Sequence, residues 1–83
     1  MIIEFNKKVP QFNESNFIAE NATLIGDVVL GQNSSVYFNS VLRGDSNRIL
    51  IGENSVIEDM CMLHVNAFDE DIIIVSAHSS RYR

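Results

Sequence analysis

Residues 18–45 read IAENATLIGDVVLGQNSSVYFNSVLRGD, and an Ile, Leu or Val stands at every sixth position of this stretch. After a jump of nine residues, the same spacing resumes at Ile51 and continues to Leu63. The aliphatic positions of the repeat are Ile18, Leu24, Leu30, Val36, Leu42, Ile51, Ile57 and Leu63. A period of six fits neither the ~3.6-residue period of an α-helix nor the alternation of an antiparallel strand.

Two further columns of residues follow the same period. Three residues after an aliphatic position, Asn or Asp occurs at six of seven places, and Met60 is the exception. The next residue is small or of modest size, for example Ala22, Ser34, Ser40, Ser46, Ser55 and Cys61. Asn, Asp and Gly adopt left-handed backbone conformations at low cost, so they favour tight turns. The pattern therefore predicts short extended segments joined by turns.

Three six-residue segments close one triangular coil of eighteen residues, and the aliphatic side chains of successive coils then stack inside. An insertion of three residues near 43–50 explains the jump of nine. We predict an all-β fold, a left-handed parallel β-helix of about two and a half coils. A continuous helix is the competing interpretation. Val36, Val41 and Val56, together with four glycines, disfavour it.

The repeat divides the chain into an N-terminal arm (1–17), the β-helix coils (18–65) and a divergent C-terminal tail (66–83). The tail leaves the six-residue spacing and contains an aliphatic run at residues 72–75. We expect this run to act as an edge cap on the open coil or, if it stays unpaired, as an aggregation site. Solenoids need several stacked repeats and caps, so we expect an isolated monomer to be marginally stable.

Composition narrows the functional classes. The net charge of −5 disfavours non-specific binding to nucleic acid or to an acidic membrane. The longest aliphatic run is far shorter than the ~20 apolar residues that span a bilayer, and no signal peptide is recognisable. Cys61 is the single cysteine, which fits a reducing compartment and a packing role. We expect a cytoplasmic protein.

The motifs of this chain, in their order along the sequence, resemble those of a known protein family. The motifs are FIAENA (17–22), IGDV (25–28), SSVY (34–37), VLRGD (41–45), ILIG (49–52) and IED followed by LH (57–64). Together they resemble the N-terminal part of gamma-class carbonic anhydrases, hexapeptide-repeat proteins that form trimers with metal between subunits. The spacing of Arg-Gly-Asp, the acidic pair and Leu-His is more specific than the repeat, which many acyltransferases share.

The resemblance implies a role for five residues. His64 matches the first of three zinc-binding histidines of the family. Arg43 and Asp45 match a pair whose ion bridge joins neighbouring subunits; the alternative for them is a solvated surface pair. Asp59 matches an acidic position near the metal. Glu58 stands where the family usually has a Gln that hydrogen-bonds the metal-bound hydroxide, so the resemblance implies catalytic roles for Glu58 and Asp59.

The repeat supports part of this assignment independently. Across the insertion one coil has 21 residues, so His64 should lie one coil above Arg43. Each follows an inward-facing leucine, so both side chains should point outward. Glu58 and Asp59 are adjacent in an extended segment and should face opposite sides, which disfavours joint acid–base action.

The implied function is hydration of carbon dioxide to bicarbonate by zinc-bound hydroxide in a homotrimer. A catalytic zinc needs three protein ligands, and the family's later His-x4-His pair has no counterpart here, since His78 is the only other histidine. We therefore expect a truncated family member with an incomplete site. A site made of three His64 side chains on a threefold axis is a further possibility.

Two alternative functions stay open. In the first alternative, the coils form a non-catalytic trimerising module or scaffold. The second alternative is a hexapeptide-repeat acyltransferase, in which His64 acts as the base towards an acyl donor such as coenzyme A. Metal content separates the enzyme from the scaffold, and binding of an acyl donor is the mark of a transferase.

Overall fold

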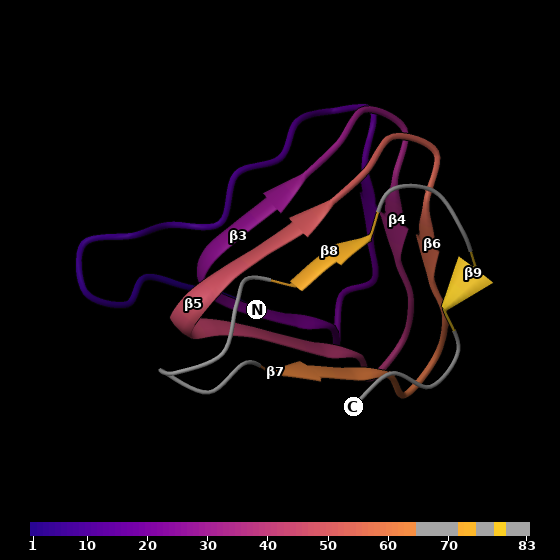
Figure 1. The fold of residues 1–83 in the computed structure, drawn as a ribbon. Helices are drawn as coiled ribbons and strands as arrows, with labels where there is room; N and C mark the ends of the chain where they lie inside the picture. Colours follow the sequence, from indigo (N-terminus) through magenta and orange to yellow (C-terminus); the bar gives the residue numbers. More distant parts are fainter. Residues whose placement is uncertain (65–71, 75–77, 80–83) are drawn as a thin grey trace.

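The computed structural model describes residues 1–64, 72–74 and 78–79, with side chains for residues 1–64. The described residues form strands and turns arranged as a triangular coil (Figure 1). The strands are β1 (Ile2–Ile3), β2 (Phe17–Ile18), β3 (Thr23–Leu30), β4 (Ser35–Val36), β5 (Val41–Ile51), β6 (Val56–Ile57), β7 (Met62–His64), β8 (Ile72–Ile74) and β9 (His78–Ser79). No helix that is long and apolar enough to cross a membrane occurs in this described part.

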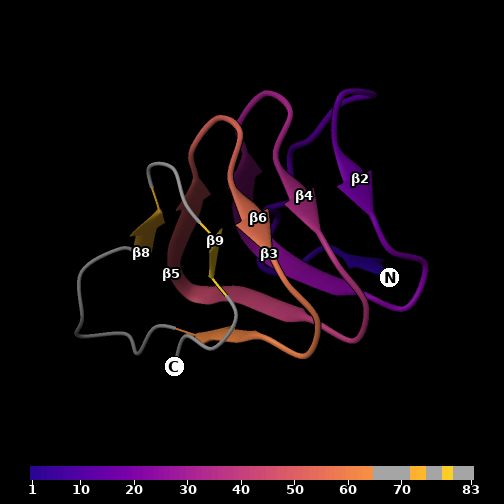
Figure 2. The same ribbon diagram turned by 90° about the vertical axis from the view of Figure 1, so that its right-hand side faces the viewer.

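All pairings between these strands are parallel, and each strand lies beside the one from the next coil (Figure 2). One sheet has the order β1-β3-β5-β7, with β8 also paired to β5, and the second has the order β2-β4-β6-β9. The long strands β3 and β5 bend between two walls of the coil. The result is a parallel β-helix of about three turns, as the six-residue period predicts.

The predicted aliphatic columns form the core. Leu24 pairs with Leu42 and Leu42 with Leu63, so one column runs through three successive coils. The other predicted columns are also present, as Ile18–Val36–Ile57 and Leu30–Ile51. Seven of the eight side chains are at most 6% exposed, and Ile18, in the first coil, is partly buried against them. Burial of each such side chain contributes about 1.5–3 kcal/mol to folding.

The insertion is absorbed at the corner between the two halves of β5. Val28 pairs with Ile49, and the pairing register shifts between Gly26 and Val28. Ile49 is fully buried, whereas Ser46, in the column of small residues, is exposed, unlike the buried Ser34, Ser40 and Ser55 of the same column. The extra residues bulge outward at the corner, and Ile49 takes the inward place. At the same corner, a Cβ on Gly44 would lie 2.5 Å from the Asp27 carbonyl oxygen.

Four of the predicted turn positions adopt left-handed backbone conformations. The φ angles are 61° at Asn33, 61° at Asn39, 60° at Asn54 and 59° at Met60. Asn tolerates this region, because its short polar side chain hydrogen-bonds locally, whereas most other L-residues pay about 1–2 kcal/mol there. Met60 therefore occupies a left-handed turn position that favours Asn or Gly.

The arm and the tail both extend the coil, which brings it from the predicted two and a half turns to about three. β1 pairs with β3, and Gln11 exchanges hydrogen bonds with Val28 and Leu30 (2.8 and 2.9 Å), so the arm covers two walls of the first coil. In the tail, Ile74 pairs with Ile51, which is 74 − 51 = 23 residues earlier. This pairing favours the edge-cap alternative for the run at 72–75. The predicted boundaries at 17/18 and 65/66 stay predictions, and residues 65–71, 75–77 and 80–83 lie outside the described part.

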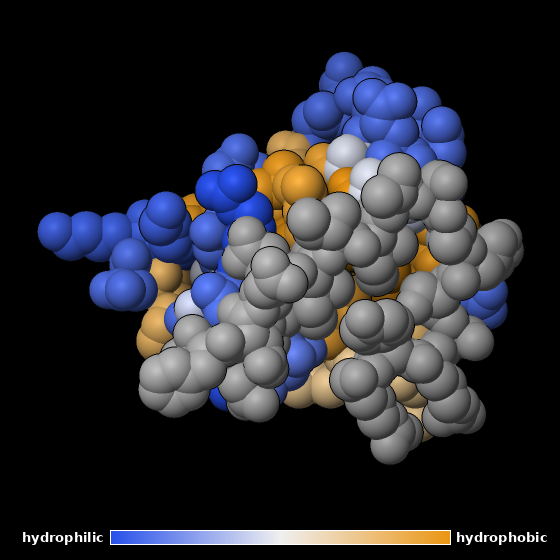
Figure 3. Space-filling view, in the orientation of Figure 1, coloured by the Kyte–Doolittle hydropathy of each residue, from blue (hydrophilic) through white to orange (hydrophobic). Residues whose placement is uncertain are grey.

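Hydrophilic and hydrophobic residues separate on the face of the triangle seen in Figure 1. Blue, hydrophilic residues gather at the upper right and in the left projection, where Figure 1 shows the N-terminal arm, and orange, hydrophobic residues lie between them (Figure 3). Asn33, Asn39 and Asn54 occupy turns of the coils, which is why the Asn and Asp column of the sequence has the period of the coil.

We predict that Met60→Asn raises the free energy of unfolding by about 1 kcal/mol, because Asn removes left-handed strain at that turn. Urea unfolding followed by circular dichroism measures the change. Met60→Ala is the matched control, since it removes the same exposed side chain but keeps a Cβ without a polar group. Equal stability of the two variants would contradict the explanation.

Candidate functional site

Arg43, Asp45 and His64 form one cluster on the outer face of the β5–β7 wall. Arg43 and His64 are direct partners in the parallel pairing, which confirms the predicted stacking one coil apart. Arg43 Nη2 donates to Asp45 Oδ2 at 2.8 Å, and His64 Nε2 lies 3.4 Å from Asp45 Oδ1. A single carboxylate thus lies between the guanidinium and the imidazole.

The strand alternation explains why these side chains meet. Leu42 and Leu63 point into the core, so the residues that follow them, Arg43 and His64, point outward. Asp45 is two residues beyond Arg43 and shares its face. The side chains of Arg43, His64 and Asp45 are 40%, 32% and 17% exposed, respectively. The carboxylate is therefore the most buried of the three groups.

The environment keeps Asp45 ionised. The hydrogen bond from Arg43 lowers the pKa of the Asp45 carboxyl, and the charge of Arg43, with that of His64 when protonated, acts in the same direction, while burial opposes them. Within the described residues, buried Oδ1 accepts no hydrogen bond. His64 Nε2, at 3.4 Å, is placed to supply a donor after a small movement of the imidazole.

The Arg43–Asp45 pair lies within one chain in this structure. The resemblance implies a bridge between subunits for these residues, and that role stays a prediction. An exposed ion pair contributes about 0–1 kcal/mol to stability. The Arg43–Asp45 pair therefore matters more for orienting neighbouring side chains than for the stability of the fold.

Glu58 and Asp59 lie at the corner between β6 and β7. Asp59 is exposed, and its Oδ1 accepts a hydrogen bond from the Phe38 amide at 3.1 Å. Both carboxylates, with Tyr37 and Val56, line an open hollow on the outside of this corner. The expectation that they face opposite sides was wrong, because Glu58 and Asp59 lie where β6 gives way to a turn and not in an extended strand. The bond to Phe38 gives Asp59 a structural role in holding two coils together, and the catalytic roles of Glu58 and Asp59 stay predictions.

Ser40 orders that corner, a role that the repeat did not predict. Its fully buried hydroxyl donates to the Glu58 carbonyl at 2.6 Å and accepts from the Cys61 amide at 3.2 Å. The only sequence signal was its place in the column of small residues. Cys61, in the same column, is buried beside it, as a packing role requires.

The described residues do not fit a complete metal site. No group of three or more His, Cys, Asp and Glu side chains is arranged to hold an ion within this part of the chain. Among the residues that the structure describes, His64 has one acidic neighbour, Asp45, and the side chain of His78 lies outside the described part. A tetrahedral zinc needs about three protein ligands and an open position. Further ligands are therefore needed beyond these residues.

Known proteins resemble the chain over the coils. A carbonic anhydrase of Geobacillus kaustophilus is 44% identical over 64 residues, which are 77% of this chain and 35% of that protein. "Gamma carbonic anhydrase 3, mitochondrial" of Arabidopsis thaliana is 43% identical over 58 residues, which are 70% of this chain and 22% of that protein. A crystal structure of a candidate acetyltransferase from Bacillus cereus superposes with a TM-score of 0.88 at 33% identity and covers 96% of this chain and 48% of that one.

A scan against protein-family models gave no match. The relatives nevertheless confirm the predicted resemblance to the N-terminal part of this family, and the superposition confirms the left-handed hexapeptide-repeat fold. The chain spans about a third or less of the length of the two carbonic anhydrases. It therefore carries part of the fold that those relatives build.

We predict different effects for two buried serines of one column. Ser40→Ala removes two hydrogen bonds and should lower the free energy of unfolding by about 1–2 kcal/mol. Ser55→Ala should leave it unchanged or raise it, because the buried Ser55 hydroxyl has no hydrogen-bond partner in the described part of the chain. Urea denaturation of both variants tests this difference. An equal loss in both would show that packing, and not hydrogen bonding, sets the cost.

Proposed function

Because the chain matches the N-terminal part of the gamma-class carbonic anhydrase family, we propose that it contributes His64 to a metal centre that hydrates carbon dioxide to bicarbonate. The observation that carries the proposal is the position of Asp45 Oδ1, buried and 3.4 Å from His64 Nε2. Metal-bound imidazoles commonly donate their second N–H to a carboxylate, which fixes the tautomer and the ring orientation. Asp45 is placed to be that carboxylate.

Each residue of the cluster has a role in this proposal. Asp45 accepts the Nε2–H of His64, which leaves Nδ1 as the nitrogen available to a metal. Arg43 holds the carboxylate from the other side at 2.8 Å and keeps it ionised. Arg43 and Asp45 are thus positioning residues for His64, and in an assembled particle they are the residues that we place at the boundary between subunits.

The remaining ligands come from outside the described residues, in our proposal from neighbouring subunits of a homotrimer. Zinc, when bound, lowers the pKa of a coordinated water to about 7 and so supplies hydroxide at neutral pH. Glu58, when ionised, accepts hydrogen bonds but does not donate them. A Gln at this position would also donate a hydrogen bond, for example to a metal-bound hydroxide, which Glu58 does not do while it is ionised.

An acyltransferase is the second candidate function. The Bacillus cereus structure supports it, because a candidate acetyltransferase shares the coil at a TM-score of 0.88. The hexapeptide coil is common to both classes, so fold alone does not choose between them. Calorimetric binding of coenzyme A or its acetyl ester would favour the transferase. A trimer without metal or acyl-donor binding would favour a scaffold.

We predict that zinc copurifies with the chain and that chelation removes any carbon dioxide hydration. His64→Asn should abolish zinc retention, and Asp45→Asn should weaken it roughly 10–100-fold, because the imidazole loses its orienting carboxylate. Elemental analysis and stopped-flow hydration assays, before and after chelation, measure both effects. His78→Asn is the control and should keep its zinc. A zinc-free wild-type chain without chelator-sensitive activity would refute the enzyme proposal.

A further inference from the structure

The exposed large hydrophobic side chains gather in two places. Nine such side chains among the described residues are at least 39% exposed. Five belong to the N-terminal arm and form what we call the arm patch, and four lie on or beside the wall of β2, β4 and β6 and form the wall patch. The arm patch consists of Met1, Ile2, Phe5, Val9 and Phe12, and the wall patch consists of Phe17, Tyr37, Phe38 and Met60. Large exposed apolar patches commonly mark binding surfaces.

The three aromatic rings of the wall patch form one connected surface. The ring centroids of Phe17 and Tyr37 are 5.2 Å apart, and that of Phe38 lies 6.2 Å from Phe17 and 6.3 Å from Tyr37. All three pairs are edge-to-face, an arrangement that holds each ring in place before a partner arrives. Aromatic side chains are enriched at protein interfaces and often supply much of the binding energy there.

Acidic residues border the wall patch. The pairing of β2 with β4 and of β4 with β6 places Glu20, Phe38 and Asp59 in one column, so Phe38 lies between two carboxylates. The amide of Phe38 donates to Asp59 Oδ1 at 3.1 Å, which agrees with this register. The wall segments 17–21, 35–39 and 56–60 contain three acidic residues and no lysine or arginine, which gives a formal charge of −3.

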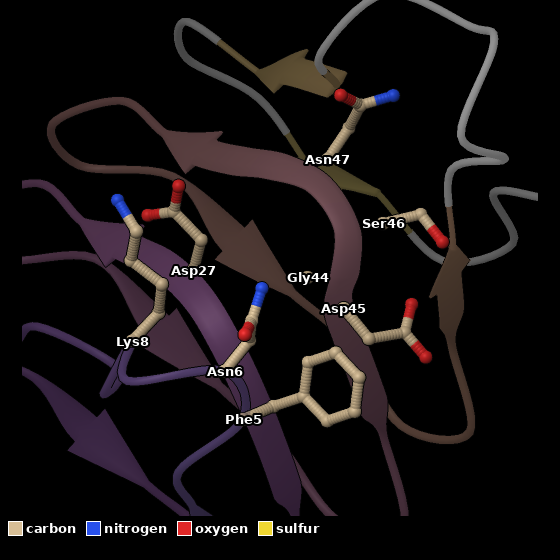
Figure 4. A pocket seen from close by; sticks show the side chains of 8 residues that line it. All are labelled: Phe5, Asn6, Lys8, Asp27, Gly44, Asp45, Ser46 and Asn47. Atoms are coloured by element: carbon tan, nitrogen blue, oxygen red, sulfur yellow. The ribbon is translucent and has the colours of Figure 1, made fainter.

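The arm has the opposite charge. Its first twelve residues contain two lysines and one glutamate, 2 − 1 = +1. The amides of Phe5 and Lys8 each donate to the carbonyl of the other at 2.9 Å, and the two residues between them have φ angles of 53° and 66°, as in a type I′ turn. Lys8 lines a small hollow with Asp27 and Asp45, whereas Lys7 is not among the lining residues (Figure 4). The turn therefore presents Lys7 and Phe5 in a fixed backbone conformation.

The two patches do not cover each other within one chain. The turn of the arm lies at the corner of β3 and β5, on the left in Figure 1, whereas β4 and β6 lie on the right. In Figure 2 the wall of β2, β4 and β6 faces the viewer. Two different patches of complementary character on separate sides of a protein suit a heterologous contact between copies.

We propose that the arm patch of one copy of this chain docks on the wall patch of a second copy. Phe5 and its apolar neighbours then cover the three aromatic rings, and the Lys7 ammonium lies against the acidic border of the wall. Docking hides both apolar surfaces and brings opposite charges together. The contact needs neither His64 nor a metal ion, so it is independent of the proposed metal centre.

Sedimentation equilibrium of the full chain, with EDTA present, tests the proposal. We expect the average mass to rise above that of one copy as the concentration increases from about 10 µM to about 1 mM. Phe38→Asp and Glu20→Lys should each weaken association about tenfold or more, because each places the wrong charge on the wall. A wild-type chain that stays monomeric over this range would overturn the proposal.

Glu53→Lys is the matched control for Glu20→Lys, because Glu53 is an exposed glutamate outside both patches. It should change association less than about twofold. Equal losses in the two variants would show that net charge governs association and would refute the docking site. His64→Asn should associate as the wild type does. Loss of association in that variant, or on addition of EDTA to the wild type, would assign the contact to the metal centre instead.

A mixture of two variants tests whether the contact joins unlike patches. Lys7→Glu keeps an intact wall patch, and Phe38→Asp keeps an intact arm patch, so each alone should stay monomeric where the wild type associates. Their equimolar mixture should form a dimer that does not grow further, because only one contact is restored. A monomeric mixture, or undiminished association of Lys7→Glu alone, would refute the arm–wall contact. Circular dichroism checks that both variants fold, and Phe38→Ser replaces Phe38→Asp if the latter does not.

Discussion

The structure depends on the stacking of inward aliphatic side chains in parallel columns. Each coil buries too little surface alone, so Leu24, Leu42 and Leu63 stabilise one another only when successive coils lie in register. This requirement makes every wall a parallel sheet and places outward residues of neighbouring coils side by side. The same constraint explains why the arm and the tail strands pair with the stack, since an uncovered coil would expose both apolar surface and unpaired backbone.

The candidate site is a direct product of that register. Because Leu42 stacks on Leu63, the residues that follow them are adjacent on the outer face, and Arg43 meets His64. Asp45 then lies between the guanidinium and the imidazole within one wall. The cluster is suited to orient an imidazole, but the described residues do not complete a metal site. Partial coverage of the related carbonic anhydrases agrees with this picture, because each relative is at least twice as long as the aligned region.

Departures from the repeat mark the places where other properties arise. Met60 keeps the left-handed backbone of its column without the side chain that suits it, since the fold of the turn is imposed by the coils on either side. The insertion between Asp45 and Ile49 bulges outward and creates the corner against which the arm folds. A small hollow lies between the arm and this corner of β5 (Figure 4), although residues 5–8 and 44–47 are 36–42 residues apart in the sequence.

The sequence alone determined the coil, because a six-residue period of aliphatics has few structural solutions and specifies which side chains point inward. It also determined that Arg43 lies beneath His64, since 21 residues make one turn across the insertion. Tertiary structure decided the inward place of Ile49, the hydrogen bonds of Ser40, the wrapping of the arm and the charge pairing around the hollow. These depend on contacts between segments that share no period, so no local pattern encodes them.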